Sequence, residues 1–183
     1  MRIIAGALKG RRLAEPTWPG LRPTSDKLRE TLFNVLGPLD GARVIDAYAG
    51  SGAIGLEAHS RGAARVTFVE LDQRACRLID ANVRRCDAGE ACAIIRADFV
   101  AAARRRLPDG EADLVFLDPP YETVDVGDAL AAAARLLAPD GRIVLEHAWR
   151  RPAPEMAGAL ARRRVIRSGD SALAIYDRRQ TGG

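Results

Sequence analysis

Four consecutive residues, Asp118-Pro119-Pro120-Tyr121, combine groups that can hold a flat nucleobase by its amino group. An ionised Asp118 accepts hydrogen bonds, and the two prolines lack backbone donors, so the carbonyl oxygens of this turn can also only accept. Tyr121 adds a ring on which a base can stack. An amine held by a carboxylate and a carbonyl directs its nitrogen lone pair out of conjugation, toward an electrophile. We therefore predict these four residues to be catalytic, although the same sequence can also form a plain turn.

A glycine-rich segment forms a second candidate site. Gly50, Gly52 and Gly55 match Gly-x-Gly-x-x-Gly after an apolar run, where the chain is expected to pass from strand to helix. Glycines let a ligand approach the backbone and leave amide groups free at a helix start. A nicotinamide dinucleotide enzyme would hold its pyrophosphate there and use an acid about 20 residues onward for the ribose. Glu70 fits that acid for either ligand, so the glycines alone leave the ligand open.

Two more acids favour a cationic nucleoside. Asp46, just before the glycines, attracts an ammonium group and would repel a pyrophosphate. Asp98 followed by Phe99 offers an acceptor and an apolar ring to an adenine. An acid at the carboxyl end of each of three neighbouring strands therefore indicates a pocket for a cationic nucleoside, and S-adenosylmethionine is such a ligand.

A parallel sheet would bring these residues together. Short apolar runs that alternate with segments of helical spacing predict an α/β fold with helices on both faces of the sheet. We expect strands at 43–47, 65–70, 92–96, 112–117 and 142–146, with helices at 52–60, 72–86, 98–105 and 125–137. Residues 163–168 and 172–177 should add an antiparallel hairpin, giving a mostly parallel, seven-stranded, Rossmann-like sheet. The acids would then follow the carboxyl ends of the strands, where open sheets bind ligands.

The first 40 residues depart from this alternation. Two short strands around Gly6 and Gly10 are expected to form a hairpin, and Thr24 or Ser25 should cap a helix that ends at Gly37. Residues 1–30 carry seven basic and three acidic side chains, which is the whole positive excess of a chain with net charge +4. We predict that residues 1–40 are a phosphate-contacting extension of one catalytic domain, 41–183. The candidate phosphate-binding residues are Arg2, Lys9, Arg11, Arg12, Arg22 and Arg29.

Composition excludes several other classes of protein. The 183 residues are 48% hydrophobic and 28% charged, as in ordinary soluble domains. No apolar run reaches the roughly 18 residues that a membrane-spanning helix needs. The three cysteines have no Cys-x-x-Cys pair and no histidine at ligand spacing. We expect a cytoplasmic protein with no metal and no membrane contact.

The motifs together resemble a known group of enzymes. Asp46 to Gly52, followed by Glu70, Asp98 and Asp118 to Tyr121, resembles class I S-adenosylmethionine-dependent amino-methyltransferases. The stretches 2–6, 10–13, 22–34 and 60–63 are similar to the RsmD family of bacterial 16S ribosomal RNA (guanine-N2) methyltransferases, and 22–34 is the most specific of them. Tyr48 departs from the phenylalanine usual in that family and adds a hydroxyl group that needs a partner.

The resemblance implies a role for each matching residue. Asp46, Gly50 and Gly52 would hold the methionine end of the cofactor, Glu70 the ribose, and Asp98 with Phe99 the adenine. Asp118 and the Pro119 carbonyl would orient the guanine N2, while Tyr121 stacks on its ring. The full set of implied cofactor residues is Thr24, Asp46, Gly50, Ser51, Gly52, Glu70, Leu71, Asp98 and Phe99.

The substrate implied by the same resemblance is a guanosine of 16S ribosomal RNA, of the guanine(966)-N2 type, in the small ribosomal subunit or an assembly intermediate. No obligate protein partner is implied. Three alternatives stay open: an amino-methyltransferase acting on another RNA or DNA base, a nicotinamide-linked oxidoreductase, and an RNA-binding assembly factor without activity. The oxidoreductase would leave Asp46 and Asp118 to Tyr121 without a role.

Overall fold

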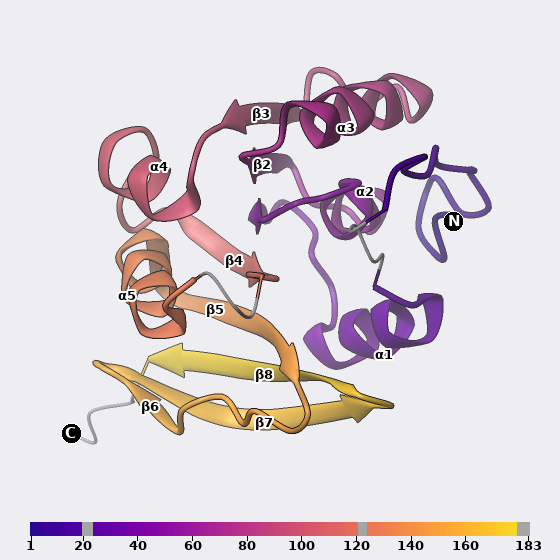
Figure 1. The fold of residues 1–183 in the computed structure, drawn as a ribbon. Helices are drawn as coiled ribbons and strands as arrows, with labels where there is room; N and C mark the ends of the chain where they lie inside the picture. Colours follow the sequence, from indigo (N-terminus) through magenta and orange to yellow (C-terminus); the bar gives the residue numbers. More distant parts are fainter. Residues whose placement is uncertain (20–23, 121–123, 179–183) are drawn as a thin grey trace. The chain divides into compact units, whose positions relative to one another are not determined.

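The computed structural model describes residues 1–19, 24–120 and 124–178. The chain divides into two compact units, Met1–Phe99 and Val100–Gly183. The first unit contains α1 (Asp26–Leu36), β1 (Arg43–Ala47), α2 (Ala53–Ser60), β2 (Arg65–Glu70), α3 (Gln73–Arg85) and β3 (Cys92–Arg96), all of which except β1 are labelled in Figure 1. The three strands predicted for this part of the chain are confirmed, and α2 is one residue shorter than predicted at its start, while α3 is one residue shorter at each end.

The strands of the first unit form a parallel sheet in the order β3-β2-β1. Val66 on β2 lies opposite Val44 on β1 and Cys92 on β3. Most side chains of β1 are buried, as expected for a strand covered on both faces. Gly55 lets α2 approach this sheet closely, because a side chain at that position would overlap the Phe68 ring.

Helix α1 follows the predicted pattern. The Ser25 side chain caps it by accepting a hydrogen bond from the Leu28 backbone N–H (3.2 Å). The apolar residues of the helix face inward, with Leu32 and Phe33 buried, and the chain leaves the helix at Gly37, whose φ of 77° suits glycine. Of the two caps considered from sequence, the structure therefore uses Ser25.

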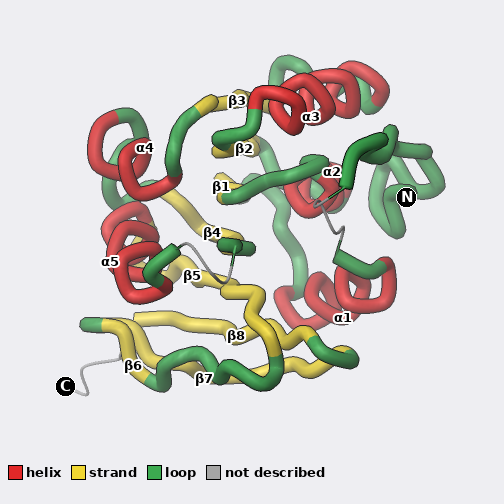
Figure 2. The backbone as a smooth tube through the Cα atoms, viewed as in Figure 1, coloured by secondary structure: helices red, strands yellow, loops and turns green. Residues whose placement is uncertain are grey.

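The amino-terminal segment, residues 1–14, lies beside α2 (Figure 2) and is attached to it by hydrogen bonds. The buried Glu57 carboxylate on α2 accepts hydrogen bonds from the backbone N–H groups of Ile4 (2.8 Å) and Ala5 (3.0 Å). The Ser60 hydroxyl accepts from the Leu8 N–H (2.9 Å) and donates to the Ala5 carbonyl (2.6 Å). This helix thus provides hydrogen-bond partners that a second strand would otherwise supply.

The predicted amino-terminal hairpin is therefore only partly formed. Arg2 and Arg12 make a single antiparallel bridge, and the residues between them form turns instead of two regular strands. The Ile4 and Ala5 N–H groups bond to Glu57 and so are not available to a strand ladder.

Gly6 and Gly10 provide a matched pair of substitutions in this segment. Both have positive φ, 82° and 84°, but a Cβ at Gly6 would overlap the Ser60 carbonyl, whereas a Cβ at Gly10 meets nothing within 4 Å. We expect Gly6→Ala to detach the segment from α2 and to make residues 1–14 sensitive to limited proteolysis, while Gly10→Ala produces only backbone strain. Equal cleavage rates in the two variants would show that close packing on Ser60 does not hold the segment.

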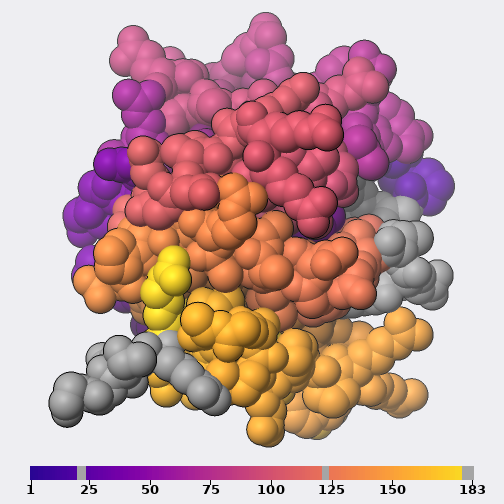
Figure 3. Space-filling model, turned by 90° about the vertical axis from the view of Figure 1, so that its left-hand side faces the viewer, coloured from indigo at the N-terminus to yellow at the C-terminus, as the bar shows by residue number. Residues whose placement is uncertain are grey.

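The second unit contains α4 (Phe99–Arg105, beginning at the last residue of the first unit), β4 (Ala112–Leu117), α5 (Val126–Leu136), β5 (Leu137–Ala148), β6 (Met156–Ala157), β7 (Leu160–Ser168) and β8 (Ser171–Arg178). β4 and β5 are parallel, and β8, β7 and β6 continue the sheet as antiparallel strands. The predicted carboxyl-terminal hairpin is confirmed as β7 and β8. Its side chains, orange to yellow in Figure 3, include the exposed Arg163 and Arg164.

Two strands of this unit differ from the predicted pattern. β5 begins at Leu137, five residues before the predicted strand, because Leu137 pairs with Ala112 of β4. The two-residue β6 pairs with the start of β7 and was not predicted, so the strands number eight among the described residues. No helix in the described ranges is long and apolar enough to span a membrane.

Candidate active site

Asp46, at the end of β1, is the most deeply buried of the predicted acids. Its carboxylate accepts a hydrogen bond from the backbone N–H of Gly55 on α2 (2.9 Å). Burial raises the pKa of Asp46 from 3.8 to about 8, and the nearby Glu70 charge adds to the increase, while the Gly55 hydrogen bond opposes it. The unfolded chain ionises Asp46 more readily than the folded protein, so the free energy of unfolding falls as the pH rises from 3.8 toward 8. A cation bound beside Asp46 would stabilise its ionised form and oppose this loss.

Glu70, at the end of β2, fixes the glycine turn. One carboxylate oxygen accepts the Gly50 N–H (2.9 Å), and the other accepts the Asp72 N–H (2.8 Å). Gly50 and Gly52 have φ of 56° and 76°, as the sequence pattern anticipated for a turn of this kind. A pyrophosphate on the Gly50 amide would meet the Glu70 carboxylate, so this arrangement suits a ligand with hydroxyl donors better.

The third predicted acid, Asp98, is exposed, but its neighbour Phe99 is not. Only 1% of Phe99 is exposed, and its ring packs at a tilt against the Tyr48 ring, with 5.7 Å between centroids. Tyr48 therefore covers this ring in the present structure, and its contact with an adenine stays a prediction. Leu71, which follows Glu70 directly, is 64% exposed and offers an apolar surface instead.

Tyr48 lies between the end of β1 and the glycine turn. The residue has a φ of 59°, in the left-handed region, and within the described part of the chain its buried hydroxyl has no hydrogen-bond partner. Burial raises the pKa of Tyr48 to about 12, and the charge of Asp98 adds to the increase. The phenol therefore stays neutral at physiological pH.

Removing this hydroxyl is expected to stabilise the protein. Tyr48→Phe should raise the free energy of unfolding by about 1 kcal/mol, because it removes a buried polar atom without a partner. Tyr176→Phe is the matched control, since the Tyr176 hydroxyl donates to the Pro154 carbonyl (2.7 Å), and it should lower the same quantity by about 1 kcal/mol. Urea unfolding measures both. Destabilisation by both variants would mean that the Tyr48 hydroxyl does find a partner in solution.

Sequence reasoning missed Asn82, which connects the glycine turn to the amino-terminal segment. This fully buried side chain on α3 donates to the Ser51 carbonyl (3.0 Å) and the Ala14 carbonyl (3.2 Å) and accepts from the Ala14 N–H (2.7 Å). A signal for it exists in the sequence, since Asn82 occupies an inward position beside Ile79 and Val83 on an amphipathic helix.

The predicted catalytic residues belong to the second unit. Asp118 follows the end of β4 and is half-buried, Pro119 is buried and Pro120 is exposed. Tyr121 lies outside the described residues. The structure thus brings together the predicted cofactor residues Asp46, Gly50, Ser51, Gly52, Glu70, Leu71, Asp98 and Phe99 at the strand ends of the first unit, and Thr24 lies half-buried just before α1.

The basic residues proposed for RNA divide into two groups. Arg2, Lys9, Arg11 and Arg12 are exposed. Arg29 is 0% exposed, and its guanidinium donates to the Arg2 carbonyl (2.9 Å) and to Asp26 (2.7 Å). Arg29 must therefore be removed from the predicted RNA contacts, because it is packed inside the first unit. Arg22 lies outside the described residues.

An α/β fold with acids at the ends of consecutive strands and a glycine turn after the first is that of a class I methyltransferase. The solved structure of the Escherichia coli protein yhhF matches with a TM-score of 0.86 and 30% identity over 97% of each chain. HI0767 from Haemophilus influenzae matches with a TM-score of 0.77 and 28% identity over 96% of each chain. The predicted α/β fold class is confirmed, and the protein is a methyltransferase.

The chain belongs to the RsmD family, whose model, described as conserved hypothetical protein 95, matches residues 1–177. Ribosomal RNA small subunit methyltransferase D of Escherichia coli strain K12 is 35% identical, over 100% of this chain and 92% of that protein. YlbH of Bacillus subtilis is 36% identical, over 98% of this chain and 100% of YlbH. The family resemblance seen in the sequence is thereby confirmed.

Proposed function

We propose that this methyltransferase transfers a methyl group from S-adenosylmethionine to N2 of a guanosine in 16S ribosomal RNA. The observation that best supports this cofactor is the position of the Glu70 carboxylate, which accepts a hydrogen bond from the Gly50 amide at the strand ends. The RNA substrate rests on full-length similarity to a protein named for methylation of small-subunit ribosomal RNA. The guanine and its N2 rest on the family resemblance and on the chemistry of residues 118–121.

The residues at the strand ends of the first unit fit this cofactor. Glu70 has acceptor capacity beyond its two backbone hydrogen bonds and would accept from the ribose hydroxyls. Buried Asp46, with the amides of the glycine turn, would hold the amino acid end. Asp98 would accept from the adenine amine, and Leu71 would cover its face. When bound, S-adenosylmethionine supplies a methyl group on a positively charged sulfur.

The residues after β4 would prepare the nucleophile. Asp118 and the Pro119 carbonyl accept the two hydrogens of the guanine amine and so turn its lone pair toward the methyl group, while Tyr121 stacks on the base. Asp118 orients the amine, and the proton leaves to water after the new bond has formed. Positioning of this kind can supply roughly 7–11 kcal/mol of the barrier reduction.

A guanine inside a helix does not present N2 to the turn at residues 118–121, so the target is proposed to be unpaired or extruded. Extrusion costs a few kcal/mol, and the cost is smallest in a loop. Residues 1–40, proposed as an RNA-contacting extension of the catalytic domain 41–183, would then hold the flanking phosphates. The exposed Arg2, Lys9, Arg11 and Arg12 remain in this proposal, with Arg22. We place the reaction in the cytoplasm, on the small ribosomal subunit or its assembly intermediate.

The salt dependence of RNA binding tests the arginines of this extension. Replacing Arg11 and Arg12 together with alanine should weaken binding and reduce the slope of log K against log salt by about 0.7 for each single-strand phosphate that the variant no longer binds. Arg77→Ala with Arg84→Ala, on α3, removes the same charge elsewhere in the first unit and serves as the control. An unchanged slope in the Arg11 and Arg12 variant would exclude both residues from the interface.

The proposed function itself is tested by transfer of labelled methyl groups. Purified protein and S-adenosylmethionine labelled in its methyl group are incubated, in parallel reactions, with naked 16S ribosomal RNA, with small ribosomal subunits or with DNA. The modified nucleotide is then mapped. We expect N2-methylguanosine at one position. Label on a different base, or on DNA alone, contradicts the proposed substrate, and tighter binding of NAD than of S-adenosylmethionine contradicts the proposed cofactor.

A further inference from the structure

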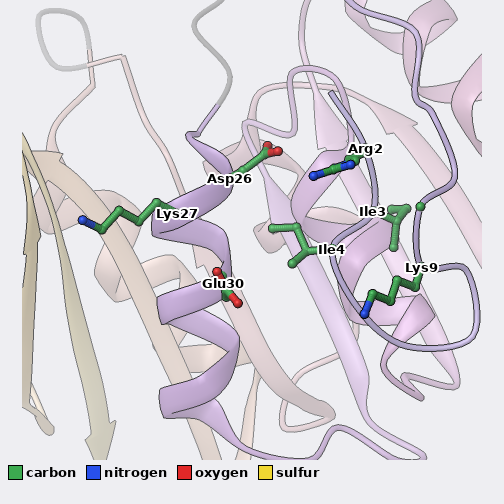
Figure 4. Close-up of a pocket in the computed structure, with 8 residues that line it drawn as sticks. Arg2, Ile3, Ile4, Lys9, Asp26, Lys27 and Glu30 are labelled. Carbon is green, nitrogen blue, oxygen red and sulfur yellow. The ribbon is translucent and has the colours of Figure 1, made fainter.

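A hollow of about 330 Å³ lies between the amino-terminal segment and α1 (Figure 4). Arg2, Ile4 and Lys9 line it from the segment, and Asp26, Lys27 and Glu30 line it from α1. Its volume falls at the lower end of the range of small-molecule sites, about 300–1,000 Å³. A hollow of this size accommodates a single nucleotide.

The charges around this hollow do not neutralise one another. Among residues 1–19, 24–120 and 124–178, no hydrogen bond or ion pair involves the side chains of Arg2, Lys9 or Glu30, although all three line the same hollow. Asp26, in contrast, is paired with the buried Arg29 (2.7 Å). In Figure 4 the Lys27 side chain extends away from Ile4. Glu30 is therefore the carboxylate of the lining that no side chain of the described residues pairs with.

The wall of the hollow is held by buried hydrogen bonds. Arg29 donates to the Arg2 carbonyl (2.9 Å), and Glu57 accepts from the Ile4 N–H (2.8 Å). Both side chains are fully buried, and Arg29 Nη1 lies 4.0 Å from Glu57 Oε2. The backbone that presents Arg2 and Ile4 is therefore fixed against α1 and α2 before any ligand arrives.

Unpaired cations and an unpaired carboxylate, on either side of an apolar residue, match the chemistry of one nucleotide. The phosphate of a nucleotide binds cations, the face of its base packs against an apolar side chain, and the edge of its base donates N–H hydrogen bonds to a carboxylate. Guanine alone presents two adjacent donors, N1–H and the N2 amine, to the two oxygens of a carboxylate. Adenine and cytosine place an acceptor nitrogen beside the amine, and uracil has a single N–H between two carbonyls.

We propose that this hollow binds a guanine nucleotide of the RNA strand that flanks the methylated nucleotide. Glu30 accepts from N1–H and N2 of that guanine, Ile4 packs on the base, and Arg2 and Lys9 bind its phosphate. The inference rests on the proposed function for the nature of the strand. It gives the extension a preference for sequence in addition to its affinity for phosphates.

The test follows the methyl groups of isoleucine by NMR in the full chain, during titration with 5′-GMP or 5′-UMP. We expect GMP to shift the Ile3 and Ile4 signals and to bind about ten-fold or more tightly than UMP, the discrimination typical of a paired hydrogen-bond contact. Glu30→Gln should reduce GMP binding to the UMP level. Glu90→Gln removes an exposed carboxylate elsewhere in the first unit and should change nothing.

Titration of a second variant distinguishes binding in this hollow from binding at the proposed catalytic residues. Asp118→Ala should leave the GMP response of Ile4 intact, because Asp118 does not line the hollow. The proposal is overturned if GMP leaves the Ile3 and Ile4 signals unchanged, if UMP binds as tightly as GMP, or if inorganic phosphate reproduces the response. A wild-type protein that fails to methylate ribosomal RNA would contradict the proposed function alone, since the NMR titration does not depend on methyl transfer.

Discussion

Asp118→Ala is expected to lower the single-turnover rate of methyl transfer by about 100-fold or more while leaving the affinity for S-adenosylmethionine unchanged. Asp118 follows β4 and is proposed to orient the guanine amine, and a reacting atom misplaced by about 1 Å can cost 100-fold in rate. The predicted cofactor residues lie in the first unit, so the substitution removes none of them. Quenched-flow measurement with saturating RNA gives the rate, and calorimetry gives the cofactor affinity.

Asp128→Ala is the control for this prediction, because it removes an exposed acid of the same unit in the first turn of α5. Asp118→Asn keeps one acceptor oxygen and should retain more activity than Asp118→Ala. A normal rate in Asp118→Ala would remove the turn at 118–121 from the chemistry, and with it the proposed grip on the amine.

The second large effect concerns stability. Glu57→Ala is expected to lower the free energy of unfolding by about 3–5 kcal/mol, because the buried Arg29 then keeps only Asp26 as a carboxylate partner among the described residues and two backbone N–H groups lose their acceptor. Arg61, which also donates to Glu57 (2.8 Å), loses the same partner. Urea unfolding measures the change, and limited proteolysis should show early cleavage within residues 1–14.

Two further variants sharpen this prediction. Glu90→Ala removes an exposed glutamate and should stay within about 0.5 kcal/mol of the wild type. Combining Glu57→Leu with Arg29→Met removes both buried charges and should recover the part of the lost stability that comes from the unbalanced buried charge, whereas the Ile4 and Ala5 N–H groups still lack their acceptor. If Glu57→Ala were as stable as Glu90→Ala, the buried contacts would have no energetic role.

The fold was predictable where the spacing of apolar residues decides the structure. The strands at β1 to β4 were correctly located, because buried parallel strands are short apolar runs between helices. The start of β5 was not correctly located. Leu137 fits the apolar spacing of the preceding helix, and its pairing with Ala112 of β4 is visible only in the folded sheet. The amino-terminal hairpin was overestimated for a related reason, since its N–H groups find Glu57, which is distant in sequence.

The candidate site was predictable in its acids but not in the residues that support it. Asp46 and Glu70 lie at the carboxyl ends of their strands and Asp98 lies just after β3, and these positions can be recognised from sequence. Arg29 was misassigned because it belongs to a basic cluster, although it stands four residues before Phe33 and next to Leu28, on the buried face of α1. Charge alone indicated the surface, whereas helical spacing would have indicated the interior.

Helix α2 has only eight residues, yet both of its ends carry functional attachments. The glycine turn precedes its first residue, and Glu57 and Ser60 in its second half hold the amino-terminal segment. At 1.5 Å per residue, about 8 Å of helix separates the glycine turn from Glu57, and about 12 Å separates it from Ser60. Insertions or deletions within α2 would therefore change the distance between the proposed cofactor site and the proposed RNA-binding segment. The length of α2 is therefore expected to vary less among related proteins than the length of the surface loops.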